Sequence, residues 1–252
     1  MGSRSRRSSQ SRANSAASGL PLVVMPHGGP IGVQDTREFD PVVQSLAAHG
    51  YAVLQVNYRG SSGKGTGFRE AGMGSWGEGI EDDIEAALDT VESKQLVDGD
   101  RVCIFGGSYG GYSALIGITR RPQRYRCAAA MAAPTDLLLM SSEYIGSAEG
   151  QRAFEKIVGN PDTDREHLIA ISPAYRAAEM NVPILLMQGD QDRVVDPEHA
   201  YRMREMLEAN GKPYEWMIIE GATHDPTAGQ WQQLMDRVDR FLAQYLQRSA
   251  AE

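Results

Sequence analysis

The stretch of sequence that decides the fold is Cys103-Ile-Phe-Gly-Gly-Ser-Tyr-Gly-Gly-Tyr112. Its apolar start ends a run that predicts a buried strand over 101–105, and a helix is predicted to follow the glycines. The central five residues fit G-x-S-x-G, in which a serine occupies a tight turn between strand and helix. The flanking glycines leave room where a Cβ would collide with neighbouring backbone. The pattern predicts that Ser108 presents a nucleophilic hydroxyl at the positive end of a helix.

Outward from this motif, short apolar runs alternate with amphipathic segments. The runs predict six strands, over 20–25, 51–57, 101–105, 126–131, 183–188 and 213–219. Few charges interrupt them, as is usual for strands covered on both faces. The alternation predicts an α/β fold with a mostly parallel, doubly wound sheet and helices on both faces.

Two of the amphipathic segments are marked by apolar residues at three- and four-residue spacing, over 78–93 and 228–247. In the first of them we expect the acidic residues to face solvent, namely Glu81, Asp82, Asp83 and Glu85.

Two longer segments break the alternation, over 58–79 and 134–180. The first holds eight glycines, which predict an irregular loop. Each follows a predicted strand, and open parallel sheets build their sites outside the carboxyl ends of strands. We therefore expect both segments to border the functional site.

Length and composition exclude several classes of protein. With 252 residues, of which 41% are hydrophobic, the chain suits one large domain, which we place at 20–252. A net charge of −8 argues against nucleic acid as a partner, because phosphate binding needs a basic face. There is no run of about 18 or more apolar residues, so we expect no membrane span and a cytoplasmic location.

The first 19 residues differ from the rest of the chain. They hold four arginines and no acidic residue, and are otherwise mostly serine, alanine and glycine. We interpret 1–19 as a disordered basic leader, a tag or truncation remnant rather than a targeting signal, because no separate apolar region follows the arginines.

A serine nucleophile needs a base, and three histidines follow Ser108 in the chain. His167 falls in a polar helical segment and His199 in the first turn of a helix, so we read both as surface residues. His224 lies just after the strand predicted over 213–219, in a loop at a carboxyl end of the sheet. We predict His224 as the base.

The base in turn needs an orienting carboxylate, which in this arrangement lies between the serine and the histidine in the chain. Asp190 and Asp192 both follow the strand predicted over 183–188. Asp190 comes directly after a glycine and can serve the turn itself, whereas Asp192 is far enough along to reach the base. We favour Asp192 over Asp190. Asp225 would have to fold back sharply.

An acyl-transfer site also needs hydrogen-bond donors for the oxyanion. One should be the backbone N–H of Tyr109, the residue after the nucleophile. The other should come from His27-Gly-Gly-Pro30, the loop after the first strand, and we choose Gly29. His27 precedes the serine, and we interpret it as a structural hydrogen-bonding residue.

Cys103 and Cys127 both lie in apolar runs, where a free thiol behaves as a small hydrophobe. A zinc site would need further ligands nearby, and there are none. A disulfide would require the two strands to pair in register, so we expect free thiols.

Taken together, these motifs resemble the catalytic domain of the prolyl oligopeptidase family of serine peptidases, especially its acylaminoacyl-peptidase-like branch. The matching motifs are Pro26-His-Gly-Gly-Pro30, Asn57-Tyr-Arg-Gly-Ser-Ser62 with Gly67-Phe-Arg-Glu70, Gly106-Gly-Ser-Tyr-Gly-Gly-Tyr112, Ser172-Pro173, Gly189 to Asp192, and Gly221 to His224. The resemblance implies the α/β-hydrolase fold. It also implies a triad of Ser108, Asp192 and His224, with Gly29 and Tyr109 as oxyanion donors.

The chain departs from the pattern of that family in several places. We expect no β-propeller before the catalytic domain, where the family usually has one, and we expect the first strands of the sheet to be missing or to lie within 1–19. Some relatives carry an arginine two residues after the catalytic aspartate, where this chain has Val194 and places Arg193 one residue early. Asp225 follows the histidine where the family commonly has glycine.

The residues and the resemblance together predict a serine hydrolase that cleaves small peptides or acyl amides through an acyl-enzyme, without metal or cofactor. The alternative is a carboxylesterase acting on small acyl esters. A non-catalytic binding protein of the same fold is a third reading, disfavoured because no triad residue is lost.

Substrate contacts are predicted from aromatic residues near the motif and the two long segments, namely Trp76, Tyr112 and Tyr144. We also expect that a sheet edge left open by missing first strands would favour a homo-oligomer.

Overall fold

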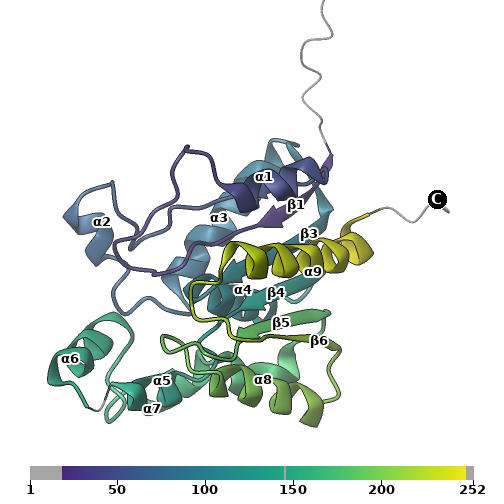
Figure 1. The fold of residues 1–252 in the computed structure, drawn as a ribbon. Coiled ribbons are helices and arrows are strands. Elements are labelled where there is room, and N and C mark those ends of the chain that lie inside the picture. The colour runs from purple at the N-terminus through teal and green to yellow at the C-terminus, as the bar shows by residue number, and fades with distance from the viewer. Residues whose placement is uncertain (1–18, 145, 248–252) are drawn as a thin grey trace, which may run out of the picture.

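The computed structural model describes residues 19–144 and 146–247 (Figure 1). The leader predicted over 1–19 lies outside the described residues, apart from Gly19. No helix among the described residues is long and apolar enough to cross a bilayer.

The described residues form one parallel sheet of six strands, as the sequence predicts (Figure 1). The strands are β1 (Leu20–Val24), β2 (Ala52–Leu54), β3 (Val97–Gly107), β4 (Cys127–Met131), β5 (Ile184–Gly189) and β6 (Tyr214–Ile219). Their order across the sheet is β2-β1-β3-β4-β5-β6, and every pair runs parallel. Since the strands share one direction, their carboxyl ends lie along a single edge.

Helices cover both faces of this sheet (Figure 1). Leu22 and Val24 of β1 join the hydrophobic cluster beneath α3 (Gly79–Ser93), α4 (Tyr109–Arg120) and α8 (Glu198–Ala209). Val23 points the other way, into the cluster beneath α1 (Pro41–Ala48) and α9 (Ala228–Leu246). This alternation follows from the two-residue period of a strand, and it confirms the doubly wound arrangement.

The helices begin where the sequence supplies a cap. Asp40 precedes α1 and its carboxylate accepts the N–H groups of Val42 and Val43 at 2.8 and 3.0 Å. Thr227 precedes α9 and forms a capping box with Gln230. Such contacts satisfy N–H groups that have no partner within the helix.

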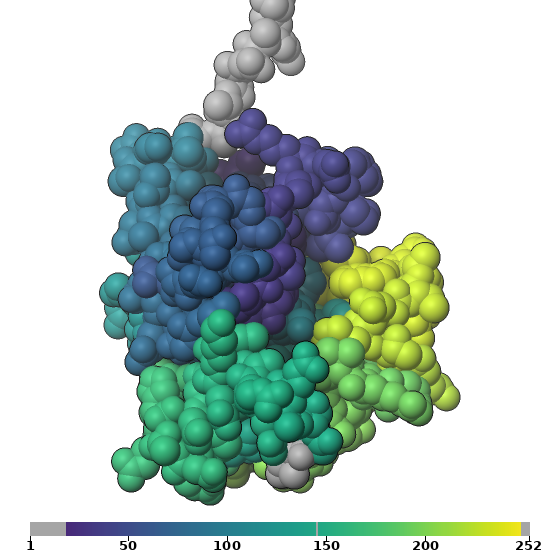
Figure 2. All heavy atoms as spheres, turned by 90° about the vertical axis from the view of Figure 1, so that its left-hand side faces the viewer, coloured from purple at the N-terminus to yellow at the C-terminus, as the bar shows by residue number. Residues whose placement is uncertain are grey.

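The two long segments fold over the carboxyl edge of the sheet, on the left-hand side of Figure 1. The first contains α2 (Thr66–Glu70), and the second contains α5 (Leu137–Glu143), α6 (Ala148–Ile157), α7 (Arg165–Ala170) and the 3₁₀ helix η1 (Pro173–Glu179). Figure 2 looks onto this side, where they and the loop after β1 surround a recessed centre.

Strand β2 is shorter than the predicted 51–57 because the chain leaves the sheet after Leu54. Asn57 accepts the N–H of Asp35 at 2.8 Å and donates to its carbonyl at 2.9 Å. The side chain therefore holds this segment against the loop after β1 rather than along the sheet.

The expectation of free thiols is wrong, since Cys103 and Cys127 form a disulfide. The two residues are direct partners in the register of β3 and β4, with Cα atoms 4.8 Å apart. That separation lies within the range that a disulfide requires. The sequence alone could not supply the register.

Candidate active site

Ser108 stands between the carboxyl end of β3 and the start of α4. Its backbone has φ of 56° and ψ of −125°, a left-handed conformation that is strained for a residue with a side chain. Its N–H donates to the carbonyl of Met131 on the neighbouring β4 at 2.9 Å, which fixes the turn. The strained turn predicted around Ser108 is therefore present.

Glycine is required on both sides of this serine. A Cβ on Gly106 would lie 2.4 Å from the backbone of Gly110, one turn along. A Cβ on Gly110 would lie 2.1 Å from the carbonyl oxygen of Pro26, in the loop after β1. The turn thus packs backbone against backbone, and any larger residue would force the two loops apart.

Asp192 and His224 meet above β5 and β6. The Nδ1 atom of His224 lies 2.8 Å from Oδ2 of Asp192. The other carboxylate oxygen, Oδ1, accepts the N–H groups of Val194 and Val195 at 2.8 and 3.0 Å. The structure brings together the predicted base and acid, and the loop backbone holds the acid in one orientation.

These contacts set the charge of Asp192. Burial acts to raise the pKa of its carboxyl, but the hydrogen bonds from His224 and from the N–H groups of Val195 and Val194 outweigh that effect. The pKa of Asp192 is lowered as a result. The carboxylate is therefore ionised at neutral pH.

The pKa of His224 shifts in the opposite direction. The hydrogen bond to Asp192 raises the pKa of His224, and the nearby carboxylates of Asp192 and Asp225 add to this, whereas burial opposes it. An imidazole in this setting is stabilised when it takes up a proton, as a general base must. Among the described residues no hydrogen bond joins His224 to Ser108, and such contacts often tighten only when substrate binds.

Asp190, the alternative acid, has a different task. Its Oδ1 accepts the N–H of Gly221 at 2.7 Å, which ties the loop after β5 to the loop that carries His224. Gly189 allows the same approach, because a Cβ there would lie 2.4 Å from the carbonyl oxygen of Ala222. The loop that carries His224 therefore packs directly against the carboxyl end of β5.

The loop after β1 lies against the nucleophile. A Cβ on Gly28 would lie 3.5 Å from the Cβ of Ser108, so the Gly28–Gly29 peptide borders the serine. Tyr109 begins α4, and the first N–H groups of a helix have no partner within it. Within the described ranges neither the N–H of Gly29 nor that of Tyr109 donates a hydrogen bond, so both are free to bind an oxyanion.

The side chain of Tyr109 points into the core, where its hydroxyl donates to Oε1 of Glu81 at 2.8 Å. Glu81 is only 2% exposed, and burial raises the pKa of its carboxyl to about 7. The expectation that Glu81 and Glu85 face solvent is wrong: Glu85 is also buried and accepts the hydroxyl of Tyr125 at 2.8 Å. Glu81 and Glu85 thus each accept a hydrogen bond from a tyrosine hydroxyl.

A signal in the sequence could have revealed these two residues. Glu81 and Glu85 share the i, i+3, i+4, i+7 spacing of the apolar face of α3 with Ile84 and Leu88. Their charge favours exposure to solvent, whereas their spacing places them on the apolar face of the helix.

The three aromatic residues predicted to contact substrate lie in two different environments. Trp76 and Tyr112 are buried and pack on the ring of Tyr109, with centroids 4.5 and 5.4 Å away. This position is in the core beneath the turn, not on an open surface. Tyr144 is partly buried and packs against Phe154, with ring centroids 6.0 Å apart. Their contact with substrate stays a prediction.

A small open cavity of about 500 Å³ lies beside His224. Arg193 and Val194 border it, and Val194 is 60% exposed. This places a cation and an apolar side chain next to the predicted base.

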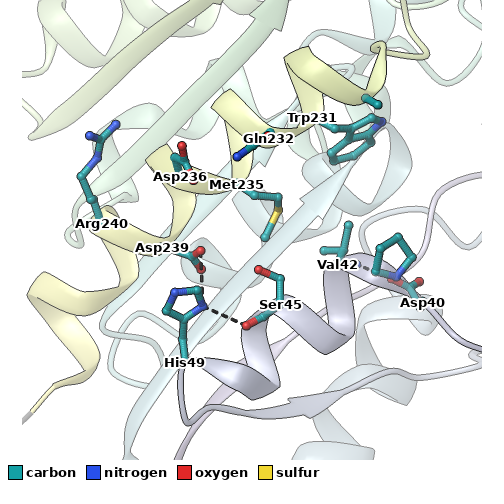
Figure 3. Close-up of a pocket in the computed structure, with 12 residues that line it drawn as sticks. Asp40, Val42, Ser45, His49, Trp231, Gln232, Met235, Asp236, Asp239 and Arg240 are labelled. Carbon is teal, nitrogen blue, oxygen red and sulfur yellow. Dashed lines mark hydrogen bonds and ion pairs between the residues drawn. The ribbon is translucent and has the colours of Figure 1, made fainter.

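A larger groove of about 970 Å³ lies elsewhere, between α1 and α9 (Figure 3). It holds a serine, a histidine and an aspartate, but in another arrangement. His49 Nδ1 hydrogen-bonds the carbonyl oxygen of Ser45 at 2.9 Å, not its hydroxyl, and lies 3.4 Å from Asp239. Ser45 is within a helix and not on a strained turn, so this groove lacks the features of an acyl-transfer site.

Comparison with known proteins places the chain among peptidases. The model of the prolyl oligopeptidase family matches residues 37–249. Dipeptidyl aminopeptidase BIII of Pseudoxanthomonas mexicana is 34% identical over 208 residues, which cover 81% of this chain and 30% of the relative. The acylamino-acid-releasing enzyme of Sus scrofa is 29% identical over 216 residues, which cover 81% and 28%. The chain thus spans less than a third of the length of these curated relatives.

Solved structures give the same picture. A Mycobacterium tuberculosis puromycin-hydrolyzing peptidase superimposes with a TM-score of 0.85 at 27% identity, covering 92% of this chain and 35% of that one. Pyrococcus horikoshii acylaminoacyl peptidase reaches a TM-score of 0.83 at 21% identity, covering 95% and 39%. The second likeness shows the shared fold.

Proposed function

The chain belongs to the prolyl oligopeptidase family, and from that premise we propose that it is a serine peptidase that cleaves peptide or acyl-amide bonds through an acyl-enzyme. The resemblance stated from the sequence motifs is confirmed by the family match. One observation carries the proposal: Oδ2 of Asp192 lies 2.8 Å from Nδ1 of His224, on the same edge of the sheet as a serine in a strained turn.

In the proposed reaction, Ser108 attacks the carbonyl carbon of the substrate while Nε2 of His224 takes the hydroxyl proton. Asp192 keeps the other ring nitrogen protonated, which leaves Nε2 free to accept. It also stabilises the imidazolium that forms. His224 then gives its proton to the leaving amine, and a water molecule repeats the sequence to release the acyl group.

Two backbone N–H donors stabilise the negative charge that develops on the carbonyl oxygen of the tetrahedral intermediate. Gly29 lies in the loop after β1 and Tyr109 begins α4, and in the proposed site the N–H group of each contributes on the order of 3 kcal/mol. The start of α4 adds its positive end at the same place.

The names of the relatives support amide cleavage, since they include a dipeptidyl aminopeptidase, an acylamino-acid-releasing enzyme and a puromycin-hydrolyzing peptidase. The chain corresponds to only part of those proteins, so the proposal concerns the chemistry of this domain.

The test is to label the protein with a fluorophosphonate and to compare an aminoacyl p-nitroanilide with a short p-nitrophenyl ester. We expect labelling at Ser108 and turnover of the anilide, both lost in Ser108→Ala. Rapid ester cleavage without amide turnover would favour the carboxylesterase. Absence of labelling in the folded protein would point to a non-catalytic binding protein.

A further inference from the structure

We propose that the groove between α1 and α9 binds the leaving segment of a long peptide substrate, meaning the residues that follow the scissile bond, and selects a lysine or arginine near the end of that segment. The inference rests on the proposed function, because it names a class of substrate for that reaction. It starts from the groove of about 970 Å³ between the two helices, which falls in the size range of ligand sites (Figure 3).

The groove has an apolar end and a polar end. Each helix contributes about one side chain per turn to it, because residues three and four apart share one side of a helix. Along each helix the contribution is apolar first and polar last: Trp231, Met235 and Asp239 from α9, and Val42, Ser45 and His49 from α1 and its C-terminal end (Figure 3).

The apolar end lies at the carboxyl edge of the sheet, where the candidate site is. α1 follows the loop that carries Gly29, and α9 follows the loop that carries His224. Ala228, the first residue of α9, lines the groove and comes four residues after His224. Four residues of chain span at most about 14 Å. About four residues of an extended peptide therefore cover the distance from His224 to the groove.

The leaving segment departs from the same side of the site. In the proposed reaction His224 gives its proton to the leaving amine, so this segment begins beside the imidazole ring. The loop that carries His224 leads directly into α9. A leaving segment that follows this loop enters the groove at Trp231.

The apolar end offers contacts for the middle of such a segment. Trp231 is only partly buried, and Val42 faces it from α1 (Figure 3). Phe39, three residues before Val42, is 79% exposed. Apolar side chains gathered at a surface are typical of interaction sites. An extended peptide therefore finds aromatic and aliphatic partners before it reaches the polar end.

The polar end holds a carboxylate that is short of donors. Oδ2 of Asp239 lies 3.4 Å from Nδ1 of His49, but that nitrogen also bonds the carbonyl oxygen of Ser45 at 2.9 Å. Oδ1 of Asp239 is buried and has no hydrogen-bond partner among the described residues. Native structures rarely leave such an atom unsatisfied. α1 also ends here, and the C-terminal end of a helix favours a cation.

The balance of charge points the same way. Asp40, Asp236 and Asp239 line the groove, against one guanidinium. That group belongs to Arg240, and Figure 3 shows it pointing away from α1. Burial raises the pKa of Asp239, and Asp236 adds to this, whereas His49 opposes it. A lysine or arginine beside Asp239 would stabilise the ionised carboxylate.

The spacing along α9 predicts where the basic residue of the substrate stands. Trp231 and Asp239 are eight residues apart in one helix, or about 12 Å. About four residues of an extended peptide cover that length. With the four residues that lead from His224 to the groove, the lysine or arginine should be about the eighth residue after the scissile bond.

The test is a lysine scan. Peptides with ten residues after the scissile bond carry one lysine, moved from the second to the tenth of these positions, and the reference peptide has norleucine there instead. For wild-type protein we expect kcat/KM to peak with lysine near the eighth position, roughly 5- to 20-fold above the reference and through a lower KM. A flat scan, or a peak within the first three positions, would overturn the inference.

Two variants connect this preference to the groove. Asp239→Asn removes the charge and keeps the shape, and should reduce the preference for lysine to less than about twofold. Trp231→Ala should lower kcat/KM for lysine and norleucine peptides alike, by roughly fivefold or more relative to an aminoacyl p-nitroanilide, which has no leaving segment. If Trp231→Ala does not fold, the scan and Asp239→Asn still decide.

The matched control is Glu205→Gln, which removes an equal charge from an exposed position on α8, on the other face of the sheet. It should keep the preference for lysine. A preference that survives Asp239→Asn, or that falls equally in Glu205→Gln, would overturn the inference. Wild-type protein that turns over the anilide without preferring lysine would refute the role of the groove alone, whereas failure to turn over the anilide would count against the proposed function.

Discussion

The sharpest prediction concerns Asp192→Asn, because the structure dictates how the new amide must lie. Oδ1 of Asp192 accepts two backbone N–H groups, from Val194 and Val195. An amide nitrogen at that position would face two donors, so the asparagine must place its oxygen there. Its NH₂ group then points at Nδ1 of His224.

Facing an NH₂ donor, Nδ1 of His224 has to give up its proton, and the proton moves to Nε2. In that tautomer Nε2 cannot accept the proton of Ser108. The loss expected for such an inverted tautomer is on the order of 10⁴-fold in kcat, or about 5 kcal/mol. The hydrogen bond to Asp192 is also the main cause that raises the pKa of His224, so the residual activity should begin at a lower pH.

The matched control is Asp190→Asn, two residues earlier in the same turn. Oδ1 of Asp190 accepts the N–H of Gly221, and an asparagine oxygen can keep that bond. We expect activity within about threefold of wild type, because this bond survives and the base keeps its partner. The assay is the pH dependence of kcat/KM on an aminoacyl p-nitroanilide for all three proteins. An Asp192→Asn variant that stays folded and loses less than tenfold would refute the reasoning.

Three further predictions concern stability. Burial raises the pKa of Glu81 to about 7, so the folded chain holds its proton more tightly than the unfolded chain, and stability should fall by about 3 kcal/mol as pH rises from about 4.5 to about 7. Urea unfolding near pH 5 and pH 8 should show this decline in wild type and not in Glu81→Gln; equal declines would contradict it. Reducing the bond between Cys103 and Cys127, 24 residues apart, should cost about 3 kcal/mol in the same assay, and an unchanged midpoint would count against the disulfide. Gly110→Ala sets a Cβ 2.1 Å from the oxygen of Pro26, and should lower the free energy of unfolding by about 3 kcal/mol or more; a thermal midpoint equal to wild type would show that the loop yields.

The sequence was most informative where one short segment determines the local structure. All six strands are where hydrophobic runs predict them, and the turn at Ser108 follows from glycines whose absent Cβ atoms make room for backbone. The preference for Asp192 over Asp190 also rested on local reach, and the structure places Asp192 against His224.

The parts that sequence reasoning missed depend on pairings between distant segments. The disulfide required the register of β3 and β4, which no local pattern contains. Glu81 has its partner on a different helix, Tyr109 of α4, so its burial is stabilised by a group that α3 alone does not show.

The order of the strands has a consequence for the synthesis of a peptidase. The groups assigned to the reaction follow four different strands: Gly29 follows β1, Ser108 follows β3, Asp192 follows β5 and His224 follows β6. With these roles, Ser108 has no base until β6 has joined the sheet, and β6 leaves the ribosome last of the six. In the proposed mechanism, Ser108 of the growing chain is therefore not yet activated. On the proposed assignment, the site is therefore complete only when nearly the whole domain has been synthesised.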